Sequence, residues 1–151
     1  MQKALASAGL DCEVREFPAS TRTAREAAAA IGCQVAAIAK TIVFKASQSG
    51  EAVLVVASGT NRVDEARVAA VIGESVEQAT PDFVRAQTGF SIGGVPPCGH
   101  PHPLRVVVDR DLLQLDSVWA AAGTPNAVFA IAPSKLQSLT DGTLADIASA
   151  R

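Results

Sequence analysis

The sequence lacks the basic charge pattern of a nucleic-acid-binding protein and the long apolar runs of a membrane protein. Its 13 basic residues are interspersed with 15 acidic ones, and the formal net charge is -2. Because there is no basic tail or stripe, DNA is not an expected partner and any contact with RNA must be local. No apolar run approaches the roughly 20 residues that cross a bilayer, so we expect no membrane partner.

Cysteine is scarce, and the common nucleotide-binding motifs are missing. Cys12, Cys33 and Cys98 are an odd number at unrelated spacings, and no charged N-terminus with an apolar signal-peptide core precedes them. We therefore expect a reduced, cytoplasmic setting. The chain has no GxGxxG motif, no P-loop, no internal repeat and no low-complexity linker. Its 151 residues, of which 48% are hydrophobic, predict one domain over residues 1–151.

Capping signals predict most of the helices. The clearest signal is the capping-box spacing of Thr23 and Glu26 before an alanine-rich run. Asn61 is expected to cap a second helix, and Thr80 with Pro81 to open a third. The predicted helices are residues 1–9, 23–32, 62–72, 81–88, a short one around 111–123, 133–139 and 143–149.

The predicted strands begin with a hairpin. Two β-branched runs at residues 38–44 and 51–57 are separated by "KASQSG", which indicates two central antiparallel strands. Further strands are predicted at 12–17, 104–109 and 127–131. The expected fold is α+β (mixed α/β): a mixed, mostly antiparallel central sheet of about five to six or more strands, flanked by helices.

One segment, "TGFSIGGVPPCGHPHP" at residues 88–103, concentrates glycine, proline and both histidines. Gly93 and Gly94 permit positive φ and let a ligand come close to the main chain. Pro96 and Pro97 fix their own φ and remove two N–H donors. Such a rigid loop could bind an ammonium group through carbonyls or stabilise developing charge through amides. A tight structural turn is the alternative reading.

The side chains of this segment raise a second possibility. Cys98, His100 and His102 form C-x-H-x-H, a set of potential metal ligands, and Cys98 with His100 could act as nucleophile and base. A structural zinc site usually needs four ligands, and the sequence has no second Cys or His cluster. We therefore predict neither a metal nor another cofactor, and expect His100 to hydrogen-bond the loop or contact substrate.

A lysine inside an apolar strand is the next unusual feature. In "AKTIVFK", Lys40 must either extend outward or face a cleft where an anion can meet it, because its ammonium group resists burial. The period of two places Lys40 on the face of Ile42 and Phe44, whereas Lys45 shares the other face with Thr41. A surface lysine at the end of a strand is the alternative.

Small residues return near the C-terminal third of the chain. In "AAGTPNAVF", Gly123, Pro125 and Asn126 come directly before a predicted strand. They could form a second wall of a site, or only a turn.

Three segments, in their order along the chain, resemble the YbaK/ProX family. They are "AKTIVFKASQSGEAVLVVASG", "TGFSIGGVPPCGH" and "AGTPNAVFAIAP", and the likeness extends from about Phe17 to Ile147. Members of this family are free-standing relatives of the editing domain of bacterial prolyl-tRNA synthetases. The resemblance implies an aminoacyl-tRNA deacylase that hydrolyses the ester between a wrong amino acid and the 3′ end of a tRNA.

The resemblance also implies roles for individual residues. Lys40 matches the family's lysine, which holds the phosphate or terminal adenosine of the tRNA, and Gly93 to Pro97 match the G-x-x-x-P loop that lines the scissile ester. Backbone groups, a water molecule and a hydroxyl of the terminal ribose would then do the chemistry. The implied catalytic residues are Lys40, Gly93, Gly94 and Pro97. The implied substrate-binding residues are Thr41, Phe44, Lys45, Val95, Pro96, His100, Gly123, Pro125 and Asn126.

The resemblance gives less detail about the substrate and the partners. The family's subgroups act on alanine, serine, threonine, cysteine or other small residues, and Cys98 stands where one subgroup often has an aromatic residue. A small amino acid is therefore expected, with the acceptor end of aminoacyl-tRNA as the partner and a synthetase or elongation factor as a possible helper. The rival function is a non-catalytic module that binds aminoacyl-tRNA or a synthetase and retains the fold.

Overall fold

A mixed β-sheet organises the molecule. In the computed structural model, which describes residues 14–18, 23–92, 94–97, 100, 104–124 and 126–149, this sheet has eight strands. Seven follow the order β1-β7-β6-β2-β3-β5-β8, and β4 pairs with β2 beside them. The strands are β1 (Val14–Glu16), β2 (Ile38–Ala46), β3 (Ala52–Ser58), β4 (Val76–Gln78), β5 (Arg105–Asp109), β6 (Val118–Ala121), β7 (Ala127–Ile131) and β8 (Thr143–Ala145).

The prediction of a mixed, mostly antiparallel sheet of about five to six or more strands is confirmed. The pairs β1–β7, β6–β7, β2–β3 and β2–β4 are antiparallel, and β2–β6, β3–β5 and β5–β8 are parallel. The predicted central hairpin is β2–β3, with Ile42 opposite Val55. The hairpin is central because each of its strands has further partners on its outer side.

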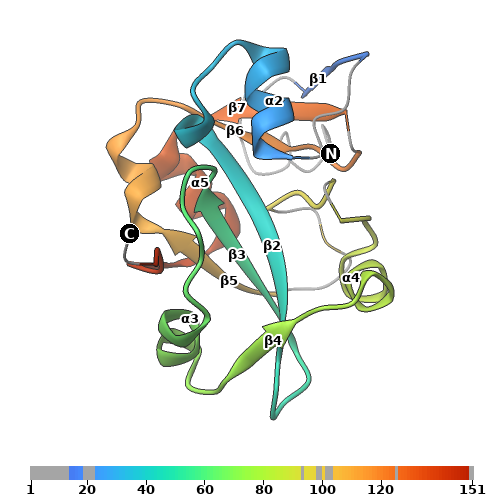
Figure 1. Ribbon diagram of the computed structural model, residues 1–151, viewed down its shortest axis with the longest axis vertical. Coiled ribbons are helices and arrows are strands. Elements are labelled where there is room, and N and C mark those ends of the chain that lie inside the picture. The colour runs from blue at the N-terminus through green and yellow to red at the C-terminus, as the bar shows by residue number, and fades with distance from the viewer. Residues whose placement is uncertain are drawn as a thin grey trace.

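The outer edge of β2 is only partly covered. β3 pairs with β2 from Ala39 to Lys45, but on the opposite side β6 pairs only with Ile38 and Ala39, and β4 only from Phe44 to Ala46. Among the described residues, no strand therefore pairs with the stretch from Lys40 to Val43 on this side. Figure 1 shows the length of β2, with β6 near one end and β4 near the other.

The helices follow their capping residues. They are α2 (Ala24–Ile31), α3 (Glu65–Ile72), α4 (Pro81–Thr88) and α5 (Pro133–Thr140), with 3-10 turns η1 (Val35–Ala37) and η2 (Arg110–Gln114). The predicted helix start is confirmed with Thr23 as the N-cap, since the Thr23 hydroxyl accepts from the Glu26 amide at 3.1 Å and donates to the Glu26 carboxylate at 3.0 Å. Thr80 likewise caps α4 by accepting from the Phe83 amide.

The predicted cap of α3 was wrong. Asp64, rather than Asn61, is the N-cap, and its carboxylate accepts from the amides of Ala66 and Arg67. An ionised carboxylate is a strong acceptor at a helix N-terminus. Asn61 lies three residues earlier and is buried, with its side chain engaged elsewhere.

Two other predicted helices need correction. Residues 118–121 and 143–145 are strands rather than parts of helices, and only 110–114 of the first segment is helical, as a 3-10 turn. Strand β4 was not predicted. Each of these strands has three or four residues and depends on pairing with a partner distant in sequence, which overrides local propensity. The predicted helix at 1–9 lies outside the described residues.

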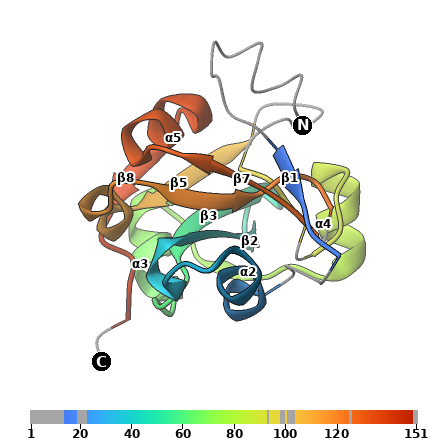
Figure 2. The ribbon, with the colours of Figure 1, turned by 90° about the horizontal axis from the view of Figure 1, so that it is seen from above.

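Helices cover both faces of the sheet. Figure 2 shows α5 on one side and α2 with α3 on the other. Val53 and Val55 of β3 pack with Val68 of α3, whereas Val56 lies in the cluster that contains Leu136 of α5. The predicted alternation of β2 is confirmed, because Phe44 joins the α3 cluster and Val43 joins a different one. No helix in the described part of the chain is long and apolar enough to span a membrane.

Candidate functional site

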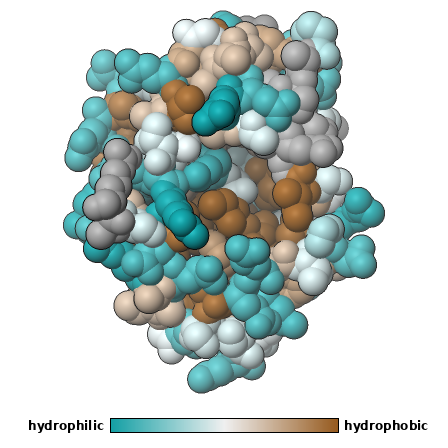
Figure 3. Space-filling view, viewed as in Figure 1, coloured by the Kyte–Doolittle hydropathy of each residue, from teal (hydrophilic) through white to brown (hydrophobic). Residues whose placement is uncertain are grey.

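A cavity of about 430 Å³ opens beside the uncovered edge of β2. Five consecutive residues of that strand, from Lys40 to Phe44, line it. Consecutive residues point to opposite faces of a strand, so a cavity that touches all of them lies against the strand edge. The remaining lining residues are Arg62, Val63, Glu65, Gln78, Ala79, Val84, Ile92 and Val95. Figure 3 shows hydrophobic side chains gathered in a hollow on this face, with hydrophilic residues around them.

A second, smaller cavity adjoins the same edge. Its volume is about 60 Å³, and Lys40, Thr41 and Val95 line it as well as the larger one. Its other walls come from α2 and its cap, from the start of β2 and from the β6–β7 pair. They are mostly apolar: Thr23, Ala24, Ala27, Ile38, Ala39, Trp119, Ala120, Ala121 and Val128. The two cavities therefore share a boundary at Lys40, Thr41 and Val95.

Lys40 is half-buried where the cavities meet, and its ammonium group is held by the chain. Nζ donates a hydrogen bond of 2.6 Å to the backbone carbonyl of Asn61. Burial lowers the pKa of Lys40 below its ordinary value of 10.5, and the negative charge of Asp109 partly opposes this effect. An ammonium group has three donors, so the bond to Asn61 leaves two for a ligand.

Thr41 presents a polar atom to the same place. Its Oγ1 is buried, and among the described residues it has no hydrogen-bond partner. A buried hydroxyl without a partner costs free energy. A ligand that reached this atom would remove that cost.

The glycine-proline loop closes the site from the opposite side. Residues Gly94 to Pro97 are buried, and Val95 packs in the cluster that contains Val43 and Val84. The Gly94 amide donates to the carbonyl of Ser91 at 3.0 Å. The loop thus reaches the cavities through Val95. Gly93, Cys98 and His102 lie outside the described residues, as do the metal-ligand and nucleophile readings that depend on them.

Behind the loop, His100 and Gly123 both contact Phe90. The rings of Phe90 and His100 meet edge to face with centroids 5.9 Å apart. Gly123 has φ +102, and a Cβ there would lie 3.1 Å from Cε1 of Phe90. Neither His100 nor Gly123 lines either of the two cavities described above.

The other predicted site residues lie in different places. Phe44 is buried and forms part of the larger cavity. Lys45 lies over the ring of Phe83, 5.6 Å from its centroid. Asn126 is exposed and anchors β1, because its amide donates to the carbonyl of Phe17 at 3.0 Å. Pro125 lies outside the described residues.

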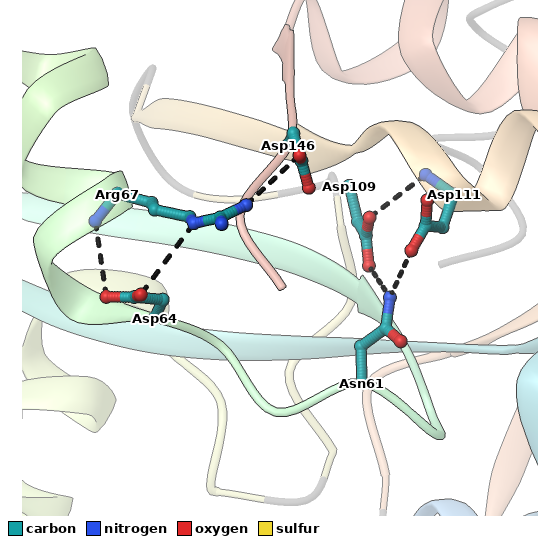
Figure 4. Close-up of polar contacts among 6 residues, drawn as sticks. All are labelled: Asn61, Asp64, Arg67, Asp109, Asp111 and Asp146. Carbon is teal, nitrogen blue, oxygen red and sulfur yellow. Dashed lines mark hydrogen bonds and ion pairs between the residues drawn. The ribbon is translucent and has the colours of Figure 1, made fainter. Parts of the chain in front are cut away.

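The sequence analysis missed a polar cluster next to Lys40. Asp109 is fully buried, and its carboxylate accepts from the Ser58 amide at 3.1 Å, the Asn61 side chain at 2.8 Å and the Asp111 amide at 3.0 Å. Figure 4 shows the Asn61 side chain directed at both Asp109 and Asp111. One sequence signal was available: Asp109 ends an otherwise apolar strand, and aspartate is almost never buried without partners.

Comparisons with known proteins identify the family and several relatives. The model of the aminoacyl-tRNA editing domain family matches residues 18–139. YwhH of Bacillus subtilis (strain 168) is 31% identical over 128 residues, which are 85% of this chain and 81% of YwhH. A protein of Enterococcus faecalis (strain ATCC 700802 / V583) with the name "Putative Cys-tRNA(Pro)/Cys-tRNA(Cys) deacylase EbsC" is 27% identical over 126 residues, 83% of this chain and 76% of its own.

A solved structure shares the whole fold. It is described as a "putative trans-editing enzyme for prolyl tRNA synthetase", has a TM-score of 0.92 and 47% sequence identity, and the match covers 99% of this chain and 94% of that one. The family match spans both the β2 edge and the glycine-proline loop that form the site. The chain therefore belongs to the aminoacyl-tRNA editing domain family, a family of aminoacyl-tRNA deacylases.

Proposed function

We propose that this protein is a hydrolase that removes a small amino acid from mischarged tRNA in the cytoplasm. The observation that carries the proposal is the meeting of a large and a small cavity at Lys40, Thr41 and Val95. An aminoacyl ester has a large part and a small part joined at one bond. Two cavities of unequal size that share a boundary match that shape.

The larger cavity is the place we propose for the acceptor end of the tRNA. Its volume lies within the range of roughly 300–1,000 Å³ that is common for small-molecule sites. Lys40 and Arg62 provide positive charge for a phosphate, and Ile92 and Val84 provide apolar surface for a base. The uncovered edge of β2 adds backbone groups that can bind ribose hydroxyls.

The smaller cavity is the place we propose for the amino-acid side chain. Its volume of about 60 Å³ is small beside the 430 Å³ of the larger cavity, which suits small side chains. The walls are apolar except for Thr23, Lys40 and Thr41. Cysteine behaves as a small hydrophobe with a weak S–H donor, and the unpartnered Oγ1 of Thr41 could accept from it. The name of the Enterococcus faecalis relative points in the same direction, so cysteine is our first candidate and alanine the second.

The ester would lie where the cavities meet. Water attacks the carbonyl carbon, the bond to the ribose oxygen breaks, and that oxygen takes a proton, which yields free amino acid and uncharged tRNA. Within residues 94–97 the Gly94 amide is already bonded, and Pro96 and Pro97 have none. The Val95 amide is therefore the loop donor that we assign to the developing negative charge.

A panel of charged tRNAs tests the proposal. Purified protein is incubated with tRNAs that carry cysteine, alanine, serine, threonine, proline and phenylalanine, and the release of amino acid is compared with the spontaneous rate. We expect rapid release of cysteine or alanine and none of phenylalanine, whose ring exceeds the small cavity. Release of none of them, with binding retained, would favour the rival function of a non-catalytic module.

The same panel addresses partners. We propose that the protein meets tRNA mainly through its acceptor end, with a synthetase or elongation factor supplying additional tRNA specificity. Addition of prolyl-tRNA synthetase should then increase selectivity among tRNAs without changing the order of amino acids. A changed order of amino acids would place the small-side-chain preference outside this chain.

A further inference from the structure

The turn that follows β3 fixes the ammonium group of Lys40. This turn, Ser58 to Asn61, is held from two sides. On one side the Ser58 hydroxyl donates to the Ala36 carbonyl at 2.8 Å and the Gly59 amide donates to the Ile38 carbonyl at 2.8 Å. The approach at Gly59 is close, because a Cβ there would lie 2.4 Å from the Val35 carbonyl oxygen.

On the other side, Asp109 and Asp111 hold the turn. The two N–H groups of the Asn61 amide can each serve one carboxylate, and Nδ2 lies 2.8 Å from an oxygen of Asp109 and 2.8 Å from one of Asp111. The Asp109 carboxylate also accepts from the Ser58 amide, so it binds both ends of the turn. Figure 4 shows this arrangement from Asn61 to the two carboxylates.

The Ser58–Asn61 turn also holds Lys40. The Asn61 carbonyl accepts the hydrogen bond from the ammonium group, and its position is fixed because Asn61 is buried and its side chain is hydrogen-bonded. The Asp109 carboxylate has no ion-pair partner among the described residues. Its negative charge partly opposes the lowering of the Lys40 pKa by burial. Other charged groups in this region are Arg62 and Glu65, which line the same cavity, and Asp111, which accepts from the Asn61 side chain.

We propose that Asn61 and Asp109 are positioning residues for Lys40: Asp109 fixes the Asn61 turn, and the Asn61 carbonyl holds the ammonium group at the boundary of the two cavities. The inference rests on the proposed function in one respect, because it takes Lys40 as the group that meets the tRNA. The placement itself is a property of the free protein. It can therefore be measured without any substrate.

The experiment is NMR of the lysine side chains. The chain has four lysines, Lys3, Lys40, Lys45 and Lys135, so labelled lysine gives four signals, and Lys40→Arg identifies the one of interest. In Asp109→Asn we expect the pKa of Lys40 to fall below its wild-type value, since a negative charge that favours the ammonium form is lost. Asp116→Asn is the matched control: it removes the same charge from an exposed position and should leave the Lys40 titration unchanged.

Asn61→Ala tests the hydrogen-bonded part separately. It removes the link to both carboxylates but keeps the backbone carbonyl and the other bonds of the turn, so it carries the test if Asp109→Asn does not fold. We expect the order parameter of the Lys40 ammonium group to fall and kcat/KM for deacylation to drop about tenfold. Folded variants in which neither the mobility nor the titration of Lys40 changes would overturn the inference. If the wild type deacylates nothing, the proposed function fails, whereas the NMR result still decides the placement of Lys40.

Discussion

At the residue scale, Lys40 combines a charge with a buried position. Burial lowers the pKa of its ammonium group, and Asp109 acts in the opposite direction with a smaller effect. The protonated form, which can bind a phosphate or a developing oxyanion, exists below this pKa. The lowered value means that the proton is lost at a lower pH than from an exposed lysine.

The pH dependence of activity should show this. After subtraction of spontaneous hydrolysis, we expect kcat/KM of the wild type to fall on the alkaline side, beginning below pH 10.5, the ordinary pKa of lysine. Lys40→Arg keeps its charge at every accessible pH, so its lower activity should have no such alkaline decrease. A wild-type profile as flat as that of Lys40→Arg would contradict the role of the Lys40 proton.

Gly123 is a second residue whose identity the structure explains. Its φ of +102 is strained for other residues, and a Cβ would approach the Phe90 ring. Gly73 has φ +87 with open space around it, so Gly73→Ala measures the backbone cost alone, about 1 kcal/mol.

We expect Gly123→Ala to cost about 1–2 kcal/mol more than Gly73→Ala, because the Phe90 ring must also move. Urea denaturation of both variants measures the difference. Equal costs would show that the ring yields freely and that Gly123 contributes only through its backbone.

At the scale of elements, α2 sets the size of the small cavity. Ala24 and Ala27 face it across Ile38 and Trp119. Ala27 is nearly fully buried, with 3% of its surface exposed. Added methyl groups at this position have no space other than the cavity.

Ala27→Val should therefore change selectivity. We expect slower release of cysteine and a smaller effect on alanine, since alanine needs less of the volume. Ala29→Val, at an exposed position of the same helix, is the control for helix propensity. Equal loss for both amino acids in the panel assay would place the side-chain pocket elsewhere.

The same scale shows what the sequence could predict. The helices α2 and α4 were predicted with their caps, since Thr23, Glu26 and Thr80 are local signals. Strands β4, β6 and β8 were not, because each is short and forms by pairing with β2, β7 or β5. The local pattern of "VWAA" gives no information about that pairing.

Some residues of the candidate site could likewise be predicted from the sequence, and others could not. Lys40 was identified because a lysine in an apolar strand is unusual, and Val95 because it lies in the glycine-proline loop. Asn61 was assigned to a cap that Asp64 provides, since both residues are good N-caps and only burial separates them. The role of Asp109 depends on three donors that come from other parts of the chain or from the following turn.

At the scale of the whole molecule, charge limits how the protein can meet tRNA. The net charge is -2, and the large cavity has two cationic side chains, Lys40 and Arg62. Two phosphate contacts on a single strand predict a slope of log K against log salt of about -1.4.

A salt series of tRNA binding measures that slope. A value near the prediction supports contact through the acceptor end. A slope steeper than about -4 would mean many phosphate contacts, and it would contradict the proposed binding mode.

The central claim is that Lys40, at the boundary of two cavities, is required for deacylation. The most direct test compares single-turnover deacylation of Cys-tRNA by the wild type, Lys40→Ala and Lys135→Ala. The last variant removes the same charge from an exposed position of α5. We predict that Lys40→Ala loses about 100-fold or more of the rate, while Lys135→Ala retains it. If the wild type is active and Lys40→Ala hydrolyses the ester at the same rate, the ester does not lie where the two cavities meet.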